Sequence, residues 1–372
     1  MFTPKLTGFL FWSNWGRGVQ AWINSNFLWT QFAICGLAIV LAGTKLSRYG
    51  DIIGEKLKIG STWIGLVLLA AVTSMPEMIT SCTAGGIGAP NMAAGNLFGS
   101  NLFNLAILGI LGVVMPRRAV WAGRGRRHLL SGSLNVMMML VALLVILLYK
   151  FISTEALLGD LVQLPVGIGS ILLFFLYFVS MFLIFVDERG RGATSAEAQS
   201  YGDERLPEVC VKFGIASAII VVAGWRMVVL GDILAQVPIH LLGARVVLGD
   251  SIVGTLFLAV ATSLPELTVC YAAVKMGSVD MAIGNVFGSN IFNLATFFLA
   301  DLFFIKGPIL AFVSEAHVLT GLLVALMSVF FVTASTNSRM FRGFRQVPLS
   351  AAIVVLWFIG WLFILTFTGA PE

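Results

Sequence analysis

Two carboxylates stand in parts of the sequence that are otherwise strongly apolar. Glu77 ends the motif Thr-Ser-Met-Pro-Glu at 73–77, and Glu266 ends Thr-Ser-Leu-Pro-Glu at 262–266. An ionisable side chain inside a membrane is costly, so it is a candidate functional residue by default. Hydroxyl groups precede each carboxylate, and both groups are the oxygen ligands that hard cations such as Ca²⁺ prefer. The two motifs therefore indicate an oxygen-only cation site.

A second pair of motifs follows at the same distance from each carboxylate. Gly-Asn-Leu-Phe-Gly-Ser-Asn-Leu-Phe-Asn occupies 95–104, and Gly-Asn-Val-Phe-Gly-Ser-Asn-Ile-Phe-Asn occupies 284–293. In each copy the Ser and the last Asn are four residues apart, so they share one face of a helix. Residues 65–106 align with 254–295 without a gap, and 21 of these 42 positions are identical. The chain therefore contains an internal repeat that keeps its polar groups.

The repeated polar groups form a candidate site of carboxylate, hydroxyl and amide oxygens, without His or Cys, which disfavours zinc, copper and iron. Pro76 and Pro265 cannot donate a backbone hydrogen bond, so we expect a kink that frees the carbonyl groups of Val72 and Ala261. The candidate cation ligands are Thr73, Ser74, Glu77, Ser100, Asn104, Thr262, Ser263, Glu266, Ser289 and Asn293.

Structural roles compete with this interpretation. A single buried Glu can serve only as a hydrogen-bonding residue, and Ser and Thr in membrane helices often bond to their own backbone. Two Glu residues at matched positions with identical neighbours favour binding. We expect Asp280 to cap the end of a loop and His128 to have no role. Interhelical hydrogen bonds, rather than ion ligation, are expected for Asn96, Asn101, Asn285 and Asn290.

Composition identifies the elements that position these residues. Of 372 residues, 58% are hydrophobic and 11% are charged, whereas a soluble domain carries about 25% charged residues. The chain is therefore a polytopic membrane protein. Its sequence pI is about 9.2, but the basic residues are dispersed between apolar segments, which argues against nucleic-acid binding. The four Cys residues form no paired motif, so we expect no cofactor or disulfide framework.

Apolar windows long enough to cross a membrane predict an all-α fold of ten transmembrane helices. The expected organisation is an interfacial segment at 1–27, rich in Trp, a five-helix repeat at 28–186, a connector at 187–211 and a second five-helix repeat at 212–372. The expected spans are 28–50, 61–85, 91–114, 129–149, 164–186, 212–232, 247–274, 279–304, 315–335 and 348–368.

The placement of basic residues predicts the orientation. Alternate loops carry 17 Lys and Arg residues on one side of the membrane and 5 on the other. The richer side should be cytoplasmic, which places the connector in the cytoplasm and both termini outside. Because each repeat has an odd number of helices, the second enters the membrane inverted. Inverted repeats of this kind hold their substrate near the middle of the bilayer.

The paired motifs resemble the two alpha-repeats of the calcium:cation antiporter superfamily, in the form of the membrane region of prokaryotic-type sodium/calcium exchangers. The resemblance implies that Glu77 and Glu266 ligate the cation, that the other candidate ligands line the site, and that the helices at 28–50 and 212–232 slide as a gate. Some members have Asp where this chain has Asn104 and Asn293. The site then carries two formal negative charges, which balance one Ca²⁺, two Na⁺ or two H⁺.

The expected function is secondary antiport of Ca²⁺ against Na⁺ or H⁺ by alternating access, in a plasma membrane such as the bacterial inner membrane. A monovalent cation/proton antiporter (Na⁺ or K⁺ against H⁺) on the same fold is the main alternative, and a non-transporting ion-sensing scaffold is another. An enzyme is not expected, because no nucleophile–base pair is placed. The expected partners are inorganic cations and the lipid bilayer, not nucleic acid. The sequence leaves open the coupling ion, the preference among divalent ions, and whether the protein is a monomer or a homodimer.

Overall fold

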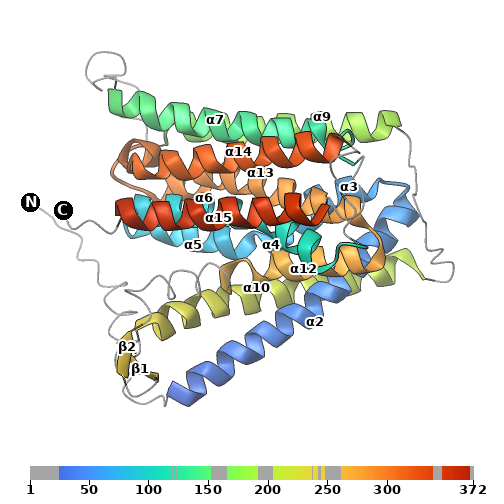
Figure 1. The fold of residues 1–372 in the computed structure, drawn as a ribbon, viewed down its shortest axis with the longest axis horizontal. Helices are drawn as coiled ribbons and strands as arrows, with labels where there is room; N and C mark the ends of the chain where they lie inside the picture. The colour runs from blue at the N-terminus through green and yellow to red at the C-terminus, as the bar shows by residue number, and fades with distance from the viewer. Residues whose placement is uncertain are drawn as a thin grey trace, which may run out of the picture.

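Long α-helices lying side by side make up most of the described part of the chain (Figure 1). The structure is a computed structural model that describes residues 25–118, 121, 124–151, 166–191, 204–236, 238–241, 244–247, 261–337 and 346–368. Its elements are α2 (Ser25–Leu57), α3 (Ser61–Trp63), the π-helix η1 (Ile64–Leu69), α4 (Ala70–Thr73), α5 (Met75–Gly86), α6 (Pro90–Val114), α7 (Leu129–Phe151), α9 (Ile168–Arg191), α10 (Leu206–Gln236), β1 (Pro238–Leu241), β2 (Ala244–Val247), α12 (Leu264–Met276), α13 (Val279–Phe303), the 3₁₀-helix η2 (Ile309–Phe312), α14 (Ala316–Thr336) and α15 (Gln346–Thr368).

Among the described residues, seven helices are long and apolar enough to cross a membrane. The number is eight when Ser61–Thr73 and Met75–Gly86, which meet at a 46° bend, are counted as one span. The apolar helix Gln346–Gly360 is shorter, and α12 follows residues 248–260, which lie outside the described part. The helical, multi-span fold is thus confirmed, and the expected ten helices are consistent with it.

Several helices are longer than the apolar windows that predicted them. α2 continues to Leu57, α9 continues to Arg191, and α10 begins at Leu206, so the last two extend into the expected connector. Hydropathy marks the part of a helix that crosses lipid, but the helix continues beyond it wherever its backbone bonds remain paired. The loop after α10 contains an antiparallel hairpin of β1 and β2, which the sequence analysis did not predict. Residues 1–24 of the expected interfacial segment lie outside the described part.

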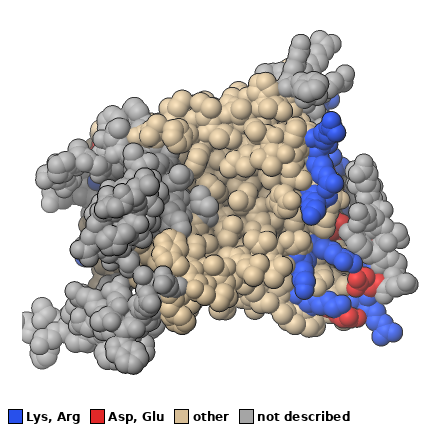
Figure 2. All heavy atoms as spheres, turned by 60° about the horizontal axis from the view of Figure 1, so that its bottom comes forward, with Lys and Arg blue, Asp and Glu red and all other residues tan. Residues whose placement is uncertain are grey.

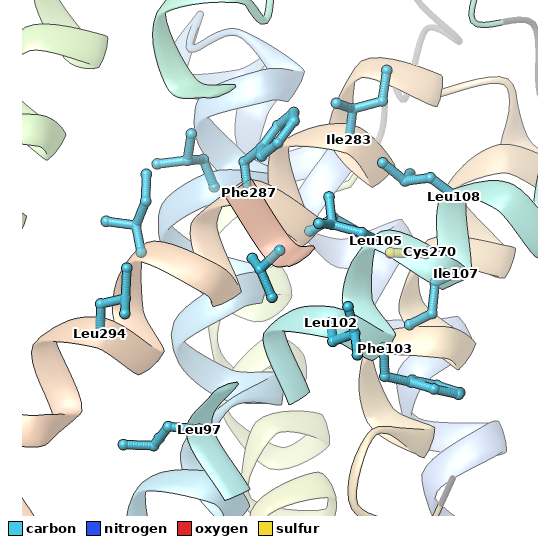
Figure 3. Close-up of a cluster of buried hydrophobic side chains, with 14 of the residues drawn as sticks. Leu97, Leu102, Phe103, Leu105, Ile107, Leu108, Cys270, Ile283, Phe287 and Leu294 are labelled. Carbon is cyan, nitrogen blue, oxygen red and sulfur yellow. The ribbon is translucent and has the colours of Figure 1, made fainter. Parts of the chain in front are cut away.

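The helices that carry the second motif, α6 and α13, lie at the centre of the fold. In their most apolar windows, 78% and 72% of the residues are buried, compared with 22% in α2. α13 packs against η1, α5, α6, α7, α9 and α12. Figure 3 shows apolar side chains from α6, such as Leu105, beside Cys270 of α12 and Phe287 of α13. Every polar group on the inner faces of α6 and α13 is therefore held inside protein rather than in lipid.

α2 and α10 form a pair on one side of the molecule (Figure 1). Two small apolar clusters between them are separate from the main core. One contains Ile39, Ala223 and Met227, and the other contains Leu28 and Leu230. The start of α2 and the end of α10 therefore pack mainly on each other.

The surface has the distribution of charge expected of a membrane protein. In the view of Figure 2, Lys and Arg gather at one end of the molecule with nearby Asp and Glu, and the side wall is formed by other residue types. Large apolar side chains are exposed along the helices, for example Phe175 and Phe182 on α9. An ion pair between Arg48 and Glu204, with 3.6 Å between nitrogen and oxygen, links α2 to the start of α10. The side of the membrane that the charged end faces stays a prediction.

Glycines bring α13 unusually close to the bent span. A Cβ atom at Gly284 would collide with the carbonyl oxygen of Thr62, and one at Gly288 would collide with that of Leu66. Farther along α13, the carbonyl oxygen of Ala300 lies against Gly85 of α5. Small residues at helix interfaces allow the backbones to approach, which increases van der Waals contact. The glycines therefore allow α13 of the second repeat to pack closely against the bent span of the first repeat, which carries Glu77.

Gly85 and its neighbour test this close approach. We expect Gly85→Ala to destabilise the protein by about 1–3 kcal/mol, because the new methyl group must displace backbone. Gly86→Ala is the matched control, since the nearest atom to its Cβ is Phe303 Cβ at 3.9 Å. Thermal unfolding of the purified proteins in detergent measures both effects. Equal unfolding temperatures for the two variants would contradict the described packing.

Candidate functional site

A break in the helix precedes each candidate acidic ligand. The first span bends by 46° between Thr73 and Met75, and Ser74 at the break has φ −91° and ψ 5°. Ser263 before α12 has φ −97° and ψ 15°. Pro lies in the first turn of α5 and of α12, where its missing N–H needs no partner. The expected kink is thus confirmed in the first repeat, and the second repeat has the same backbone conformation at the matched residue. The release of the Val72 and Ala261 carbonyl groups stays a prediction.

Glu77 and Glu266 both lie in the first turn after their breaks and are withdrawn from water. Their exposed fractions are 0% and 1%. The Ser74 hydroxyl of the first repeat donates to Glu266 Oε1 of the second repeat at 3.1 Å. Glu77 Oε1 accepts a long bond of 3.5 Å from the Ser100 hydroxyl. The Ser74 hydroxyl therefore joins the two acidic motifs rather than serving only its own helix.

A second contact between the repeats involves Thr73 and Ser289. Their hydroxyl oxygens are 3.4 Å apart, and both residues are completely buried. Ser289 lies on α13, so this contact joins the bent span to the central helix. Together with the bond from Ser74 to Glu266, it places residues of both motifs from both repeats in one cluster.

The side-chain amides of the second motif pair across the crossing of α6 and α13. Asn104 Nδ2 donates to Asn290 Oδ1 at 3.0 Å, and Asn293 Nδ2 donates to Asn101 Oδ1 at 3.0 Å. Asn96 Nδ2 donates to the Glu77 carbonyl oxygen at 3.0 Å, which joins α6 to α5. The interhelical hydrogen bonds expected of the motif asparagines are thus confirmed, including a bond from Asn285 to Cys270.

Several oxygens of this cluster make no hydrogen bond within the described residues. A buried oxygen without a partner loses its water without compensation, which costs about 1–3 kcal/mol. A bound cation would give these oxygens the partner that they lack, and Ca²⁺ takes 6–8 such ligands. Five oxygens of the cluster are of this kind. Two pairs are related by the repeat, Glu77 Oε2 with Glu266 Oε2 and Asn104 Oδ1 with Asn293 Oδ1, and the fifth oxygen is Ser263 Oγ.

The remaining candidate ligands can be placed around these oxygens. Thr262 is half-buried and directly precedes the buried Ser263, so both lie at the break before α12. The described part of the chain contains no group of three or more His, Cys, Asp or Glu residues that could hold a metal ion. The charged ligands of the cluster are therefore its two carboxylates. When both carboxylates are ionised they carry like charges, and repulsion between like charges is strong where water is excluded.

Two buried aspartates hold the ends of α13, and neither role was predicted from the sequence. Asp280, expected to be a loop-end cap, accepts from Arg124 Nη1 at 2.7 Å and Arg127 Nη1 at 2.9 Å. Its other oxygen lies 3.1 Å from Nε2 of His128, so His128 is not incidental either. Asp301 accepts from the backbone N–H of Ile309 at 2.7 Å, among other donors. The partners of Asp280 are distant in sequence, so no local pattern could reveal them.

Removing the buried charges tests whether the acidic pair serves stability. We expect Glu77→Gln and Glu266→Gln, in buffer free of divalent cations, to unfold at the same temperature as the parent protein or higher. Each change keeps the side-chain shape and removes repulsion between buried charges. Asp280→Asn is the contrasting control and should lower stability by at least about 1 kcal/mol, because its donors lose a charged acceptor. Thermal unfolding in detergent measures all three. Destabilisation by the Glu substitutions equal to that of the control would assign the pair a structural role.

Comparisons with known proteins place the chain among membrane transporters. A family model described as "Sodium/calcium exchanger protein" matches residues 27–186 and 212–367. The chain is 27% identical over 366 residues to "Sodium/calcium exchanger MaX1" of Methanosarcina acetivorans, an alignment that covers 91% of this chain and 100% of the relative. It is 28% identical over 276 residues to "Inner membrane protein YrbG" of Escherichia coli (strain K12), covering 71% of this chain and 76% of the relative.

A solved structure shows the same fold. A structure of the sodium-calcium exchanger NCX_Mj soaked with Na⁺ and Sr²⁺ covers 89% of this chain and 96% of its own chain, with a TM-score of 0.61. The sequence identity over this superposition is 19%, so the likeness is one of fold. The fold and the family match agree with the internal repeat and with the cluster of oxygens between its two copies.

Proposed function

Because the chain belongs to the sodium/calcium exchanger protein family, we propose that it is a secondary antiporter that moves Ca²⁺ against Na⁺ or H⁺. The proposal rests mainly on one observation: buried carboxylate, amide and hydroxyl oxygens from both repeats make no hydrogen bond within the described residues. Such oxygens suit a hard cation. The family consists of transporters, which agrees with a role in transport rather than catalysis.

Charge balance explains how one site can couple two ion fluxes. Glu77 and Glu266 supply two negative charges in a region that excludes water. One Ca²⁺, two Na⁺ or two H⁺ neutralise that charge equally, and any further cation would leave an uncompensated charge. Ca²⁺ and the driving ions therefore compete for the same carboxylates and occupy the site in turn. The same balance supports the alternative of monovalent cation/proton exchange, which the flux experiment below separates from Ca²⁺ transport.

We propose that the pair α2 and α10 alternates access to this site. Each helix contacts an acidic helix through a glycine. The Cβ position of Gly43 on α2 lies 2.9 Å from Thr268 Cγ2 on α12, and that of Gly224 on α10 lies 2.6 Å from Pro76 Cγ on α5. The bare backbone at these two points gives a smooth surface over the segments that carry Glu77 and Glu266. Rocking of the pair would then open the site first to one side of the membrane and then to the other.

The proposed setting is a cell's plasma membrane, with the end rich in Lys and Arg in the cytoplasm. The gathering of these side chains at one end in Figure 2 supports this orientation through the positive-inside rule. The similarity to an inner membrane protein of Escherichia coli supports the same location.

Ion flux tests the proposal directly. We expect proteoliposomes holding the purified protein to take up radiolabelled Ca²⁺ under either an outward Na⁺ gradient or a proton gradient. Glu77→Gln and Glu266→Gln should reduce the uptake by about 100-fold or more, because one lost charge leaves Ca²⁺ unbalanced. Glu208→Gln, an exposed carboxylate on α10 that pairs with Lys212, is the matched control and should transport normally.

The two gradients, applied separately, identify the coupling ion. Absence of Ca²⁺ uptake under both gradients, with folded protein, would overturn the calcium proposal. The same vesicles, loaded with a pH-sensitive dye and given Na⁺ or K⁺, would then show whether the protein exchanges monovalent cations for protons.

A substitution on the moving pair should separate binding from transport. We expect Gly224→Ala to keep the dissociation constant for Ca²⁺ within about threefold but to slow transport by about tenfold or more, because the added methyl group presses on Pro76. Gly214→Ala on the same helix is the control, since no atom lies within 4 Å of its Cβ position. Equilibrium binding and vesicle flux measure the two quantities. Normal transport by Gly224→Ala would contradict movement of α10 over the kink.

A further inference from the structure

Four buried asparagines meet where α6 packs against α13. Figure 3 shows apolar side chains of the same two helices, such as Leu105 and Phe287. Asn104 and Asn293 are candidate cation ligands, whereas Asn101 and Asn290 are not. The repeat relates the four as two pairs, Asn101 with Asn290 and Asn104 with Asn293. All four side chains have an exposed fraction of 0%. Hydrogen bonds within this group decide which end of each amide faces the site.

Two successive hydrogen bonds, which we call a relay, fix the orientation of Asn293. This first relay begins at a backbone carbonyl of α13. Asn101 Nδ2 lies 3.2 Å from the carbonyl oxygen of Asn290, which can only accept, so the NH₂ group of Asn101 must point there. Its Oδ1 then faces Asn293 and can itself only accept. Asn293 therefore donates with its own NH₂ group, over 3.0 Å. As a result, Oδ1 of Asn293 is turned away from Asn101.

The second relay has the same form with the repeats exchanged. Asn290 Nδ2 donates to the backbone carbonyl oxygen of Asn101 at 3.3 Å. Asn290 Oδ1 accepts from Asn104 Nδ2 at 3.0 Å. Oδ1 of Asn104 is therefore turned away from Asn290. Each relay starts at a backbone group, so a substitution at Asn101 leaves intact the carbonyl that orients Asn290.

The outer ends of both relays are the atoms that accept no hydrogen bond within the described residues, Oδ1 of Asn104 and Oδ1 of Asn293. Asn104 lies one helical turn after Ser100, which bonds Glu77, and Asn293 lies one turn after Ser289, which contacts Thr73. Both oxygens thus lie on the faces that line the acidic cluster. A half-turn of either amide would replace an oxygen ligand with an NH₂ group, whose positive hydrogens repel a cation.

We propose that Asn101 and Asn290 are positioning residues that hold the amides of Asn293 and Asn104 with their oxygens towards the transported cation. They do not touch the ion. They act by fixing the orientation of the amide. An amide can present either its oxygen or its NH₂ group to the cation, whereas a carboxylate presents an oxygen in either orientation. The chain can therefore use two neutral amide ligands without losing affinity for cations. This inference rests on the proposed function.

The test combines substitutions at the two ends of a relay. Asn101→Leu has a similar volume and breaks only the relay to Asn293. Asn293→Asp replaces the amide by a carboxylate, which has two equivalent oxygens and needs no orientation. Asn104→Asp adds the same charge on the other relay and is the matched control. The dissociation constant for radiolabelled Ca²⁺ is measured by equilibrium binding to the purified protein in detergent for each single variant and each combination with Asn101→Leu.

We expect Asn101→Leu to weaken Ca²⁺ binding by about tenfold or more in the parent protein, as is typical when the partner of a metal ligand is lost. In the Asn293→Asp background the same change should cost less than about twofold, because no amide remains to be oriented. In the Asn104→Asp background it should again cost about tenfold, because Asn293 is still an amide. The mirror set, Asn290→Leu with rescue by Asn104→Asp but not by Asn293→Asp, should behave likewise.

If Asn101→Leu weakens Ca²⁺ binding equally in all three backgrounds, Asn101 serves packing alone and the inference is overturned. If the parent protein binds no Ca²⁺, the proposed function is overturned as well. If Asn101→Leu yields no folded protein, Asn101→Ser, which is smaller and breaks the same relay, takes its place in the cycle.

Discussion

The structure depends on holding incompletely bonded oxygens at a place that water does not reach. Glu77 and Glu266 are fully buried, and each keeps one carboxylate oxygen that accepts no hydrogen bond within the described residues. Such an arrangement is unstable by itself, so the surrounding helices must resist collapse around it. The central position of α6 and α13 and the glycine contacts between α13 and the bent span provide that resistance.

Buried carboxylates in this chain fall into two kinds, and the number of donors separates them. Asp280 is bonded by two Arg side chains and lies beside His128. Asp301 receives backbone N–H groups of Gly167 and Ile309 and the hydroxyl of Ser170. These two residues fix the two ends of α13. Glu77 and Glu266 accept fewer bonds, which leaves charge available for an ion. The same chemical group thus anchors the helix where its hydrogen bonds are satisfied, and where they are not it is available for the proposed role as a ligand.

Repetition made much of this arrangement predictable from sequence. The ungapped match between the halves identified the acidic motifs, and apolar windows located most spans to within a few residues. The relays through Asn101 and Asn290 were not predictable, because the sequence shows that four asparagines recur but not which ends of their amides meet. The partners of Asp280 were also hidden, since more than 150 residues separate it from Arg124 and His128. Local periodicity contains no information on such distant pairs.

The two copies of the motif are nearly identical in sequence, yet their hydrogen bonds differ. Ser74 donates to Glu266, whereas its repeat mate Ser263 has no partner for its hydroxyl within the described residues. The matched residues Asn96 and Asn285 keep equivalent bonds, because the Ser81 hydroxyl and the Cys270 thiol that they reach stand at matched positions of the repeat. A symmetric sequence in one asymmetric conformation is what alternating access requires, because two inverted halves with identical bonds would expose the site equally to both sides. The amide relays, by contrast, have the same form in both repeats. The hydrogen bonds therefore keep the symmetry of the repeat at the amides and break it at the carboxylates. Under the proposed mechanism, the cation would keep its amide oxygens while its access changes.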